Sequence, residues 1–292
     1  MADLSSDIFV SAIIVTCNSE NVIAACLKSL RGQATAAGGE IMIIDNNSRD
    51  STIRSAKAVD PSIKILQSKK NIGFAAAVNK AAESARGKYL LFLNPDVILD
   101  EAAVRIMLDA MAVQPSIGAA AARMRNPDGT FQPTCRNFPD ISNMLFSRGS
   151  ILSSIKKRGI DKYTLGDFTM ITEVPAASAT CLMIERTFFN SIGGFDIRFF
   201  LFMEDTDLCL RIRQAGKKIY LVPGAGGVHL WGGSSDISSL KRSWHHHQSV
   251  WRYFLKHYPN GFSVFLLPLL LALNFVARAA IEAIARRRKP KL

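Results

Sequence analysis

The sequence predicts an α/β fold, with a doubly wound and mostly parallel β-sheet flanked by helices. Two observations support this: strand-like and helix-like patterns alternate over residues 1–125, and the strand-like runs are apolar throughout. Parallel strands need helical crossovers, and strands buried on both faces read as continuous apolar runs. The chain has 292 residues, of which 48% are hydrophobic, so it can bury a sheet of this kind.

Each element has its own signal. Apolar runs predict the strands, and apolar residues at helical spacing predict the helices between them. The predicted strands cover residues 9–16, 40–48, 62–68, 88–93 and 178–185. The predicted helices cover residues 19–30, 49–59, 73–85 and 100–111. A further helix starts near residue 204, with an expected core face of Leu208, Ile212 and Ala215 and an end at Gly216. The segment from Gln132 to Glu173 lacks periodicity, so we expect a long insertion or flexible loop there.

The net charge of +12 is concentrated at the C-terminal end. From Lys241 onward there are ten basic residues and one acid, Glu282, which gives +9 and leaves +3 for the first 240 residues. This placement argues against a body that binds nucleic acid. The five cysteines form no C-x-x-C pair, and the N-terminus lacks the features of a signal peptide. We therefore expect a cytoplasmic protein whose reduced cysteines mostly serve packing.

Two acids, Asp45 and Asp96, come directly after predicted strands. Ligands of open α/β sheets bind beyond the carboxyl ends of the strands, so both acids point to one crevice. The alternative for each is an Asx-turn or a helix N-cap, but two acids at equivalent positions favour a binding site. The stretch "TCNSEN" after the first strand has no glycine, and no Walker A sequence is present. Phosphate would therefore be held by a divalent metal, with Asp96 as the natural ligand.

A second group of acids follows the aromatic run "FFLFM". Glu204 and Asp205 are adjacent carboxylates, and apolar surroundings raise the pKa of a carboxyl and suit it to proton abstraction. Asp207 is expected to be structural, because it can pair with Arg211 one helical turn later. His229 ends a short apolar run before a Gly-Gly turn, where it is either a satisfied polar residue or a ligand.

Six motifs, taken in order, resemble those of the family 2 inverting glycosyltransferases, closest to their rhamnosyltransferase-like branch. They are "IIVTCNSE", "IIDNNSRDST", "NIGFAAAVN", "FLNPD", "GGFD…FFLFMEDTDLCLR" and "HLWGGSS", and they cover about Val10 to Ser235. The resemblance implies a GT-A fold that uses a nucleotide-diphospho-sugar and a divalent cation, Mg2+ or Mn2+. It also implies a glycosyltransferase domain over residues 1–240, with a nucleotide-binding half at about 1–125 and an acceptor-binding half at about 126–240. Residues 241–292 then form a helical, apolar and polybasic extension.

The resemblance implies a role for individual residues. Asp205 matches the catalytic base, with Glu204 as the reserve candidate. Asp96 matches the metal-binding acid of a D-x-D motif in which Asn94 replaces the first acid, and His229 matches a late histidine near the diphosphate and the metal. Asp45 matches the acid that contacts the base or ribose. The other positions implied to contact the nucleotide-sugar are Thr16, Asn18, Glu20, Asn47, Asn71, Gly73 and Asn79.

These roles combine into an inverting transfer. Asp205 would take the proton of an acceptor hydroxyl as it attacks the anomeric carbon, while a metal on Asp96 neutralises the leaving nucleoside diphosphate. The implied donor sugar is a deoxyhexose such as rhamnose, and the implied acceptor is a glycan or lipid-linked hydroxyl in cell-surface polysaccharide synthesis. Two alternatives remain. A nucleotidyltransferase would need the phosphate loop that "TCNSEN" lacks, and a non-catalytic, membrane-tethered nucleotide-sugar-binding protein is favoured only by Asn94.

The C-terminal extension combines an apolar segment with a basic end. Phe262 to Ala277 spans 16 residues interrupted by Pro268 and Asn274, fewer than the roughly 20 of a simple helical span. The basic run that follows is attracted to anionic lipid, and the alternative is an amphipathic helix packed on the enzyme or on a second subunit. We expect a peripheral or monotopic attachment to the cytosolic face of the plasma membrane. The oligomeric state stays open.

Overall fold

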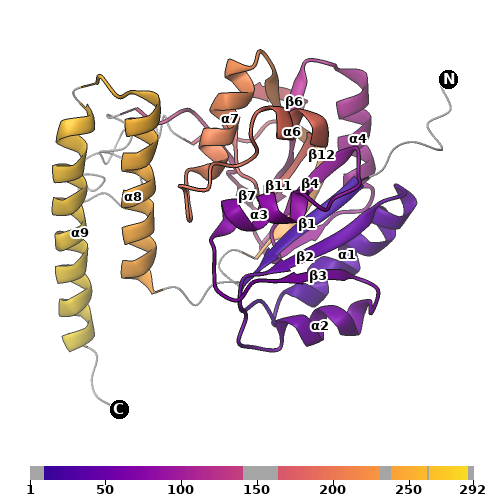
Figure 1. Ribbon diagram of the computed structural model, residues 1–292, viewed down its shortest axis with the longest axis horizontal. Helices are drawn as coiled ribbons and strands as arrows, with labels where there is room; N and C mark the ends of the chain where they lie inside the picture. The colour runs from indigo at the N-terminus through magenta and orange to yellow at the C-terminus, as the bar shows by residue number, and fades with distance from the viewer. Residues whose placement is uncertain (1–9, 141–163, 231–237, 262, 289–292) are drawn as a thin grey trace.

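The computed structural model describes residues 10–140, 164–230, 238–261 and 263–288 (Figure 1). Within these residues, the centre of the molecule is a ten-stranded sheet, in which eight strands follow the order β3-β2-β1-β4-β11-β6-β12-β5. The two other strands of this sheet, β7 and β9, pair with β6 and β12. The predicted α/β fold is confirmed.

The first half of the sheet is parallel and follows the predicted alternation. Neighbouring strands in the order β3-β2-β1-β4 all pair in parallel. The strands are β1 (Val10–Thr16), β2 (Glu40–Asp45), β3 (Lys64–Gln67) and β4 (Tyr89–Leu93). The helices are α1 (Ile23–Ala36), α2 (Thr52–Val59), α3 (Phe74–Ala82) and α4 (Ala103–Val113). The apolar runs of β1 and β4 are buried because helices cover both faces of the sheet.

The second half of the sheet is mixed. β6 (Ile117–Arg125) pairs in parallel with β12 (Lys218–His229), whereas β11 (Cys181–Glu185) runs antiparallel to both β4 and β6. A short strand, β5 (Val97–Leu99), pairs antiparallel with the end of β12. Sequence reasoning did not find β6, because "IGAAAARMR" is rich in alanine and lacks the β-branched residues that mark strands.

The segment from Gln132 to Glu173 is only partly described, and residues 141–163 lie outside the described residues. At its two ends the expectation of a loop is wrong. These ends contain paired strands, β7 (Phe131–Gln132), β8 (Cys135–Arg136) and β9 (Thr172–Val174), and β8 pairs with β10 (Ala176–Ala177). Such short strands carry too few residues to show a period of two.

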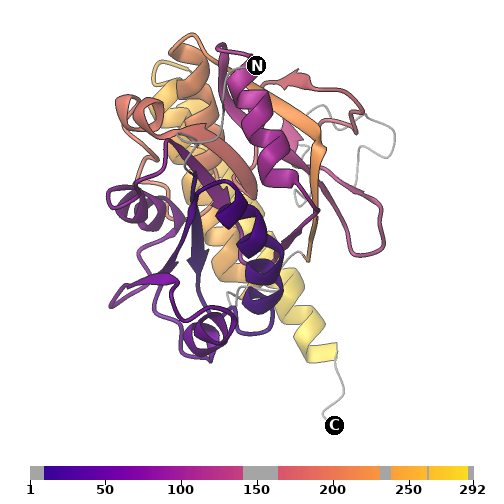
Figure 2. The same ribbon diagram turned by 90° about the vertical axis from the view of Figure 1, so that its right-hand side faces the viewer.

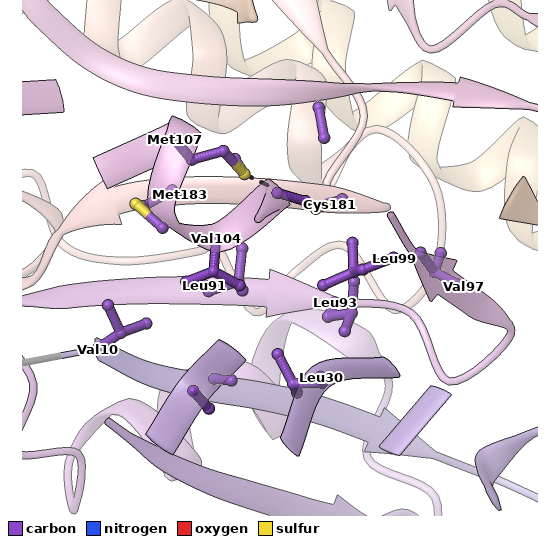
Figure 3. Packing of buried hydrophobic residues seen from close by; sticks show 14 of the residues in the cluster. Val10, Leu30, Leu91, Leu93, Val97, Leu99, Val104, Met107, Cys181 and Met183 are labelled. Carbon is purple, nitrogen blue, oxygen red and sulfur yellow. Dashed lines mark hydrogen bonds between the residues drawn. The ribbon is translucent and has the colours of Figure 1, made fainter. Parts of the chain in front are cut away.

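Two hydrophobic clusters fill the two faces of the sheet. Helices α1, α2 and α4 pack on one face, and α3, α6 (Arg186–Ser191) and α7 (Glu204–Gln214) pack on the other. Figure 3 shows part of the first cluster, where Leu30 of α1 and Met107 of α4 lie near Leu91 of β4. The buried cysteines are Cys26, Cys135, Cys181 and Cys209, as predicted for packing residues.

Helix α7 ends one residue earlier than predicted. Leu208 and Ile212 are buried as expected, but Ala215 is exposed because the helix ends at Gln214. The expectation of a core position at Ala215 is therefore wrong. Gly216 has a φ of +78°, the left-handed conformation that commonly ends a helix.

Two long helices, α8 (Ser239–His257) and α9 (Ser263–Arg288), lie side by side outside the layers of the sheet (Figure 1). Figure 2 looks from the side of α1 and α4 and shows both helices on the far side of the molecule. A third hydrophobic cluster joins them to the body, with Tyr253 of α8 and Leu267 of α9 packed near Phe199 and Met203.

Pro268 and Asn274 do not interrupt the C-terminal apolar segment, because α9 continues through both. The expected interruption is therefore wrong. Asn274 faces α8, where its Nδ2 donates to His247 Nε2 at 3.0 Å. In the part of the chain that the structure describes, one helical stretch, Val264–Glu282, is long and apolar enough to cross a membrane by length and composition.

Candidate active site

A cavity of about 1000 Å³ lies at the carboxyl ends of β1, β2 and β4, where α/β sheets bind ligands. Its lining combines polar residues of the loops after these strands with an apolar wall, Phe200 to Phe202. The beginning of α8 adds two cations, Lys241 and Arg242. The predicted site residues that line the cavity are Thr16, Asn18, Asn47, Asn71, Gly73, Asn94, Asp96 and His229.

Asp96 lies in the turn between β4 and β5, so a strand and not a helix follows it. The helix-cap alternative therefore fails for this residue. Asp96 is buried, and its Oδ1 accepts no hydrogen bond from the described residues. β5 pairs with the end of β12 so that Val97 lies opposite His229, and this register brings His229 Nε2 to 3.2 Å from Asp96 Oδ1. Two residues predicted to bind metal thus lie next to each other.

The pair fits a divalent cation. A buried carboxylate oxygen without a donor is costly, and a cation would offset that cost. Two ligands at about 2.1 Å from one octahedral ion lie about 3 Å apart, close to the separation of these two atoms. Among the described residues there is no group of three or more His, Cys, Asp or Glu side chains that could hold a metal. A cation here would therefore complete its shell with phosphate oxygens and water, as Mg2+ commonly does.

Asp45 is buried and does not line the cavity, because its carboxylate is engaged within its own loop. Oδ1 accepts from Thr16 Oγ1 at 2.9 Å and from Ser48 Oγ, and Oδ2 accepts from the Ser48 backbone N–H at 2.9 Å. This is a local side-chain-to-backbone contact like the Asx-turn considered as the alternative in the sequence, but it reaches the N–H three residues on and not two. The loop instead presents Asn47 to the cavity, with a left-handed φ of +63°.

The loops after β1 and β2 are bonded to each other. The Asn18 N–H donates to Ser48 Oγ at 2.9 Å, and Asn18 Oδ1 accepts from the Arg49 N–H at 2.8 Å. Asn18 also has a positive φ, +53°, and such strained residues tend to gather at functional sites. Glu20 lies outside the cavity lining, where its Oε2 accepts from the Ser51 N–H at 2.7 Å. Glu20 therefore supports the shape of these loops.

Gly73 allows a close approach between two backbones. Its φ is +84°, and a Cβ at this position would lie 2.5 Å from the carbonyl oxygen of Phe200. Asn71 Oδ1 accepts from the Gly73 N–H at 2.9 Å, which fixes the loop before α3. Asn79 lies outside the lining and holds the neighbouring segment, since its side chain bonds both the N–H and the carbonyl of Phe195. These residues position the apolar wall of the cavity.

Glu204 and Asp205 begin α7 directly after this wall, but neither lines the cavity itself. Phe202 and Met203 have φ values of +69° and +66°, both uncommon for residues other than glycine. Two consecutive left-handed residues turn the chain sharply from the wall into the helix. Strained backbone of this kind costs about 1 to 3 kcal/mol per residue, and it recurs at active sites.

The two carboxylates have different surroundings. Asp205 Oδ2 accepts from Arg136 Nη2, and Oδ1 accepts from the Thr206 N–H at 2.7 Å. Glu204 Oε2 is buried and receives no hydrogen bond from any residue described. Burial, with a further contribution from the charge of Asp205, raises the pKa of Glu204 to about 8. Glu204 is therefore mostly protonated at pH 7, whereas Asp205 is paired with a cation.

Asp207 fastens α8 to α7. Its carboxylate is fully buried, and Oδ2 accepts from Arg211 Nε at 2.8 Å, which confirms the predicted structural pair. Oδ1 accepts from Lys256 Nζ at 2.6 Å and from His257 Nε2 at 2.7 Å. Burial alone would raise the pKa of Asp207, but the hydrogen bond from His257 and the charges of Arg211 and Lys256 hold it below its ordinary value. The C-terminal helices are thus attached three residues from Glu204.

Sequence reasoning missed several polar residues in or beside the site. Arg49, Lys241 and Arg242 line the cavity, Arg136 binds Asp205, and Gln132 Oε1 lies 2.6 Å from His229 Nδ1. No local pattern marks the four basic residues among them. The stretch "NPDGT" is a turn signal between two strands, and it could have placed the residues after it back beside β6.

The sheet order and the position of the cavity define the class: the chain has the GT-A fold of glycosyltransferases. It is similar to the solved structure of the mannosyltransferase PcManGT from Pyrobaculum calidifontis in complex with GDP-Man and Mn2+. The TM-score is 0.60 at 16% identity, over 99% of this chain and 78% of that one. It is also similar to GalNAc-T7 with UDP, GalNAc and Mn2+, with a TM-score of 0.60 at 15% identity, over 91% of this chain and 55% of that one.

The family follows from the sequence itself. Residues 11–193 match the model of glycosyl transferase family 2, and the chain belongs to this family. It is 26% identical to the N-acetylglucosaminyl-diphospho-decaprenol L-rhamnosyltransferase of Mycobacterium tuberculosis, over 89% of this chain and 90% of the relative. It is also 26% identical to the rhamnosyltransferase WbbL of Escherichia coli, over 53% of this chain and 56% of the relative. The predicted family is confirmed, and the protein is a glycosyltransferase.

Proposed function

We propose that this glycosyltransferase transfers a deoxyhexose, L-rhamnose in the first instance, from a nucleotide-diphospho-sugar to a hydroxyl of a lipid-linked glycan. The transfer inverts the anomeric carbon and serves the synthesis of a cell-surface polysaccharide. The names of two relatives support the substrates, since one is a rhamnosyltransferase of a diphospho-decaprenol acceptor and the other is a rhamnosyltransferase. The observation that carries the site is the contact between Asp96 and His229 in the cavity.

The proposed cofactor is a divalent cation, Mg2+ or Mn2+, held by Asp96 and His229. Bound there, it would supply positive charge to the diphosphate of the donor as that group leaves. Asn94 lines the same part of the cavity and adds a neutral oxygen in place of a second carboxylate. The Mn2+ in the two similar GT-A structures supports this choice.

The loops after β1, β2 and β3 receive the nucleotide. Asn18, Asn47 and Asn71 offer amide donors and acceptors to the base, ribose or phosphates, and Arg49 adds a cation beside them. Thr16 lines the nucleotide site at the end of β1, and Gly73 shapes it by letting the backbone approach Phe200 closely. Asp45, Glu20 and Asn79 act by holding these loops in place.

Asp205 is the proposed catalytic base. Arg136 and the Thr206 N–H fix its carboxylate, and the acceptor hydroxyl must come within hydrogen-bond reach of one of its oxygens. As the hydroxyl oxygen attacks the anomeric carbon, its proton passes to Asp205, and the bond to the nucleoside diphosphate breaks. A protonated Glu204 cannot accept this proton, which favours Asp205 over the reserve candidate. One displacement gives the inverted product without a covalent enzyme intermediate.

A transfer assay tests the proposal. The donor is deoxythymidine-diphospho-L-rhamnose, the acceptor is a short-chain N-acetylglucosaminyl-diphospho-polyprenol, and NMR reads the anomeric configuration of the product. Asp205→Asn should lower kcat by about 100- to 10,000-fold while nucleotide affinity stays unchanged. Asp109→Asn, at a half-exposed helical carboxylate, is the matched control and should transfer normally. Near-normal turnover by Asp205→Asn would move the base elsewhere, and absence of rhamnose transfer by the wild type would reject the proposed substrates.

We also propose that α9 attaches the protein to the cytosolic face of the plasma membrane, in a peripheral or monotopic manner. Phe265, Leu269, Leu273 and Val276 are exposed and follow each other at intervals of three or four residues, so they form one apolar stripe. Basic residues end the sequence of this helix, and such residues attract anionic lipid.

The packing of α9 against α8 brings α9 near the cavity. Ser239 Oγ donates to Glu282 Oε2, which places the last turns of α9 beside the end of α8 that carries Lys241. A lipid-linked acceptor would therefore meet the cavity close to the membrane. Deletion of residues 262–292 should abolish sedimentation with vesicles that contain phosphatidylglycerol. A full-length chain that fails to sediment with them would reject the attachment.

A further inference from the structure

A buried amide lies directly behind His229. Gln132 is 1% exposed and sits on β7, the short strand that returns along β6 after the turn at residues 126–130. Its Oε1 lies 2.6 Å from His229 Nδ1, and its Nε2 lies 2.8 Å from Asn126 Oδ1 and 3.3 Å from the backbone oxygen of His229. No motif of the sequence had singled out Gln132.

A chain of hydrogen bonds runs from the Asp128 carboxylate to His229, and the carboxylate sets the direction of each bond in it. Asp128 Oδ1 accepts the Thr130 hydroxyl proton at 2.6 Å, so Thr130 Oγ1 is the acceptor for Asn126 Nδ2 at 2.9 Å. Asn126 Oδ1 then faces Gln132 Nε2, and Gln132 Oε1 faces His229. Since Gln132 Oε1 can only accept, His229 Nδ1 must be the protonated nitrogen of this contact.

This arrangement decides which nitrogen of His229 carries a lone pair. A neutral imidazole has one N–H, so a proton on Nδ1 leaves Nε2 as an acceptor beside Asp96. Nε2 lies 3.2 Å from Asp96 Oδ1. Two electron pairs that converge without a proton between them suit a shared cation.

We propose that Gln132 is a positioning residue that holds His229 in its Nδ1–H tautomer and thereby presents Nε2 to a divalent cation together with Asp96. The proposal rests on the proposed metal site. Outer residues that bond a ligating histidine commonly change metal affinity by about 10- to 100-fold when they are replaced. Gln132 would raise the metal affinity of the site by this amount, although it does not line the cavity.

Two variants at Gln132 and one matched control separate this role from simple packing. Gln132→Met keeps the length of the side chain and removes the acceptor, whereas Gln132→Glu keeps an acceptor for Nδ1–H. Gln114→Met removes another interelement amide, one that bonds Tyr220 OH at 3.0 Å near the opposite end of β12. Thermal unfolding of all three checks that each variant is folded.

The first readout needs no metal. Nitrogen-15 NMR of the imidazole side chains should show His229 as the Nδ1–H tautomer in the wild type and in Gln114→Met. In Gln132→Met the signal should shift towards the Nε2–H tautomer, which dominates in free histidine. A wild-type His229 with the proton on Nε2, or a tautomer unchanged in Gln132→Met, would overturn the proposal.

The second readout is Mn2+ affinity in the presence of a nucleoside diphosphate, followed by the EPR signal of free Mn2+. Gln132→Met should bind Mn2+ about 10- to 100-fold more weakly, while Gln132→Glu and Gln114→Met should stay within about threefold of the wild type. Wild-type affinity in Gln132→Met would overturn the positioning role and leave the metal site standing. A wild type that binds no Mn2+ would overturn both, even if the tautomer is as predicted.

Discussion

Glu204 should make the protein less stable as the pH rises, and replacing it should remove this effect. Burial raises the pKa of Glu204 to about 8 from an ordinary value of 4.5. An acid whose pKa is raised by folding keeps its proton in the folded state while the unfolded state has already lost it. Between pH 4.5 and 8 the unfolded state is therefore increasingly favoured. Since one pKa unit is worth about 1.4 kcal/mol, this group alone should lower the free energy of unfolding by about 3 kcal/mol between pH 5.5 and 8.5.

Glu204→Gln imitates the protonated form, so its free energy of unfolding should not fall in this way as the pH rises. The assay is urea unfolding of the wild type and the variant at both pH values, because groups that titrate in both proteins cancel in the difference. The variant should gain about 3 kcal/mol over the wild type as the pH rises from 5.5 to 8.5. Glu101→Gln, at an exposed position, is the control and should follow the wild type. Parallel pH dependences for Glu204→Gln and the wild type would refute the reasoning and mean that Glu204 ionises as in water.

Two further predictions concern the supports of the site. Asp207→Asn should lower the free energy of unfolding by about 3 kcal/mol or more, because it removes a fully buried charge that Arg211, Lys256 and His257 all bond. Asp109→Asn, at a surface ion pair, should cost under about 1 kcal/mol in the same urea titration. Equal effects of the two would contradict a buried network. Gly73→Ala should weaken nucleotide binding and destabilise the protein by more than the roughly 1 to 2 kcal/mol of a left-handed alanine, because its Cβ meets the Phe200 carbonyl. Gly216→Ala, with a similar φ but open space, should show only the smaller cost, and a match between the two would refute the close approach.

Local patterns in the sequence predicted the parallel half of the fold well. Apolar runs and helical spacing depend on neighbouring residues, and these located β1 to β4 and their helices. β6 escaped because alanine has a low strand propensity, and its place in the sheet comes from pairing with β11 and β12, which lie far away in the sequence. The contact between Asp96 and His229 depends on the register of β5 against β12, which no local pattern encodes.

The motifs predicted the neighbourhood of the site better than the role of each residue. Asp45 and Asn79 lie in matched motifs, yet neither side chain lines the cavity. Asp45 bonds the backbone of Ser48, and Asn79 bonds the backbone of Phe195. A motif records every residue that the site depends on, so supports and contacts look alike in sequence. Arg136 and Gln132 come from short strands without a readable period, and their roles emerge only from partners about 70 to 100 residues away.

The central claim is that Asp96, with His229, holds a divalent cation and through it the diphosphate of the donor. The most direct test is calorimetric titration of thymidine and uridine diphosphates, with and without Mg2+ or Mn2+, into the wild type and Asp96→Ala. We expect binding that depends on the metal in the wild type and is lost in the variant. Binding that is the same without metal and in Asp96→Ala would contradict the claim.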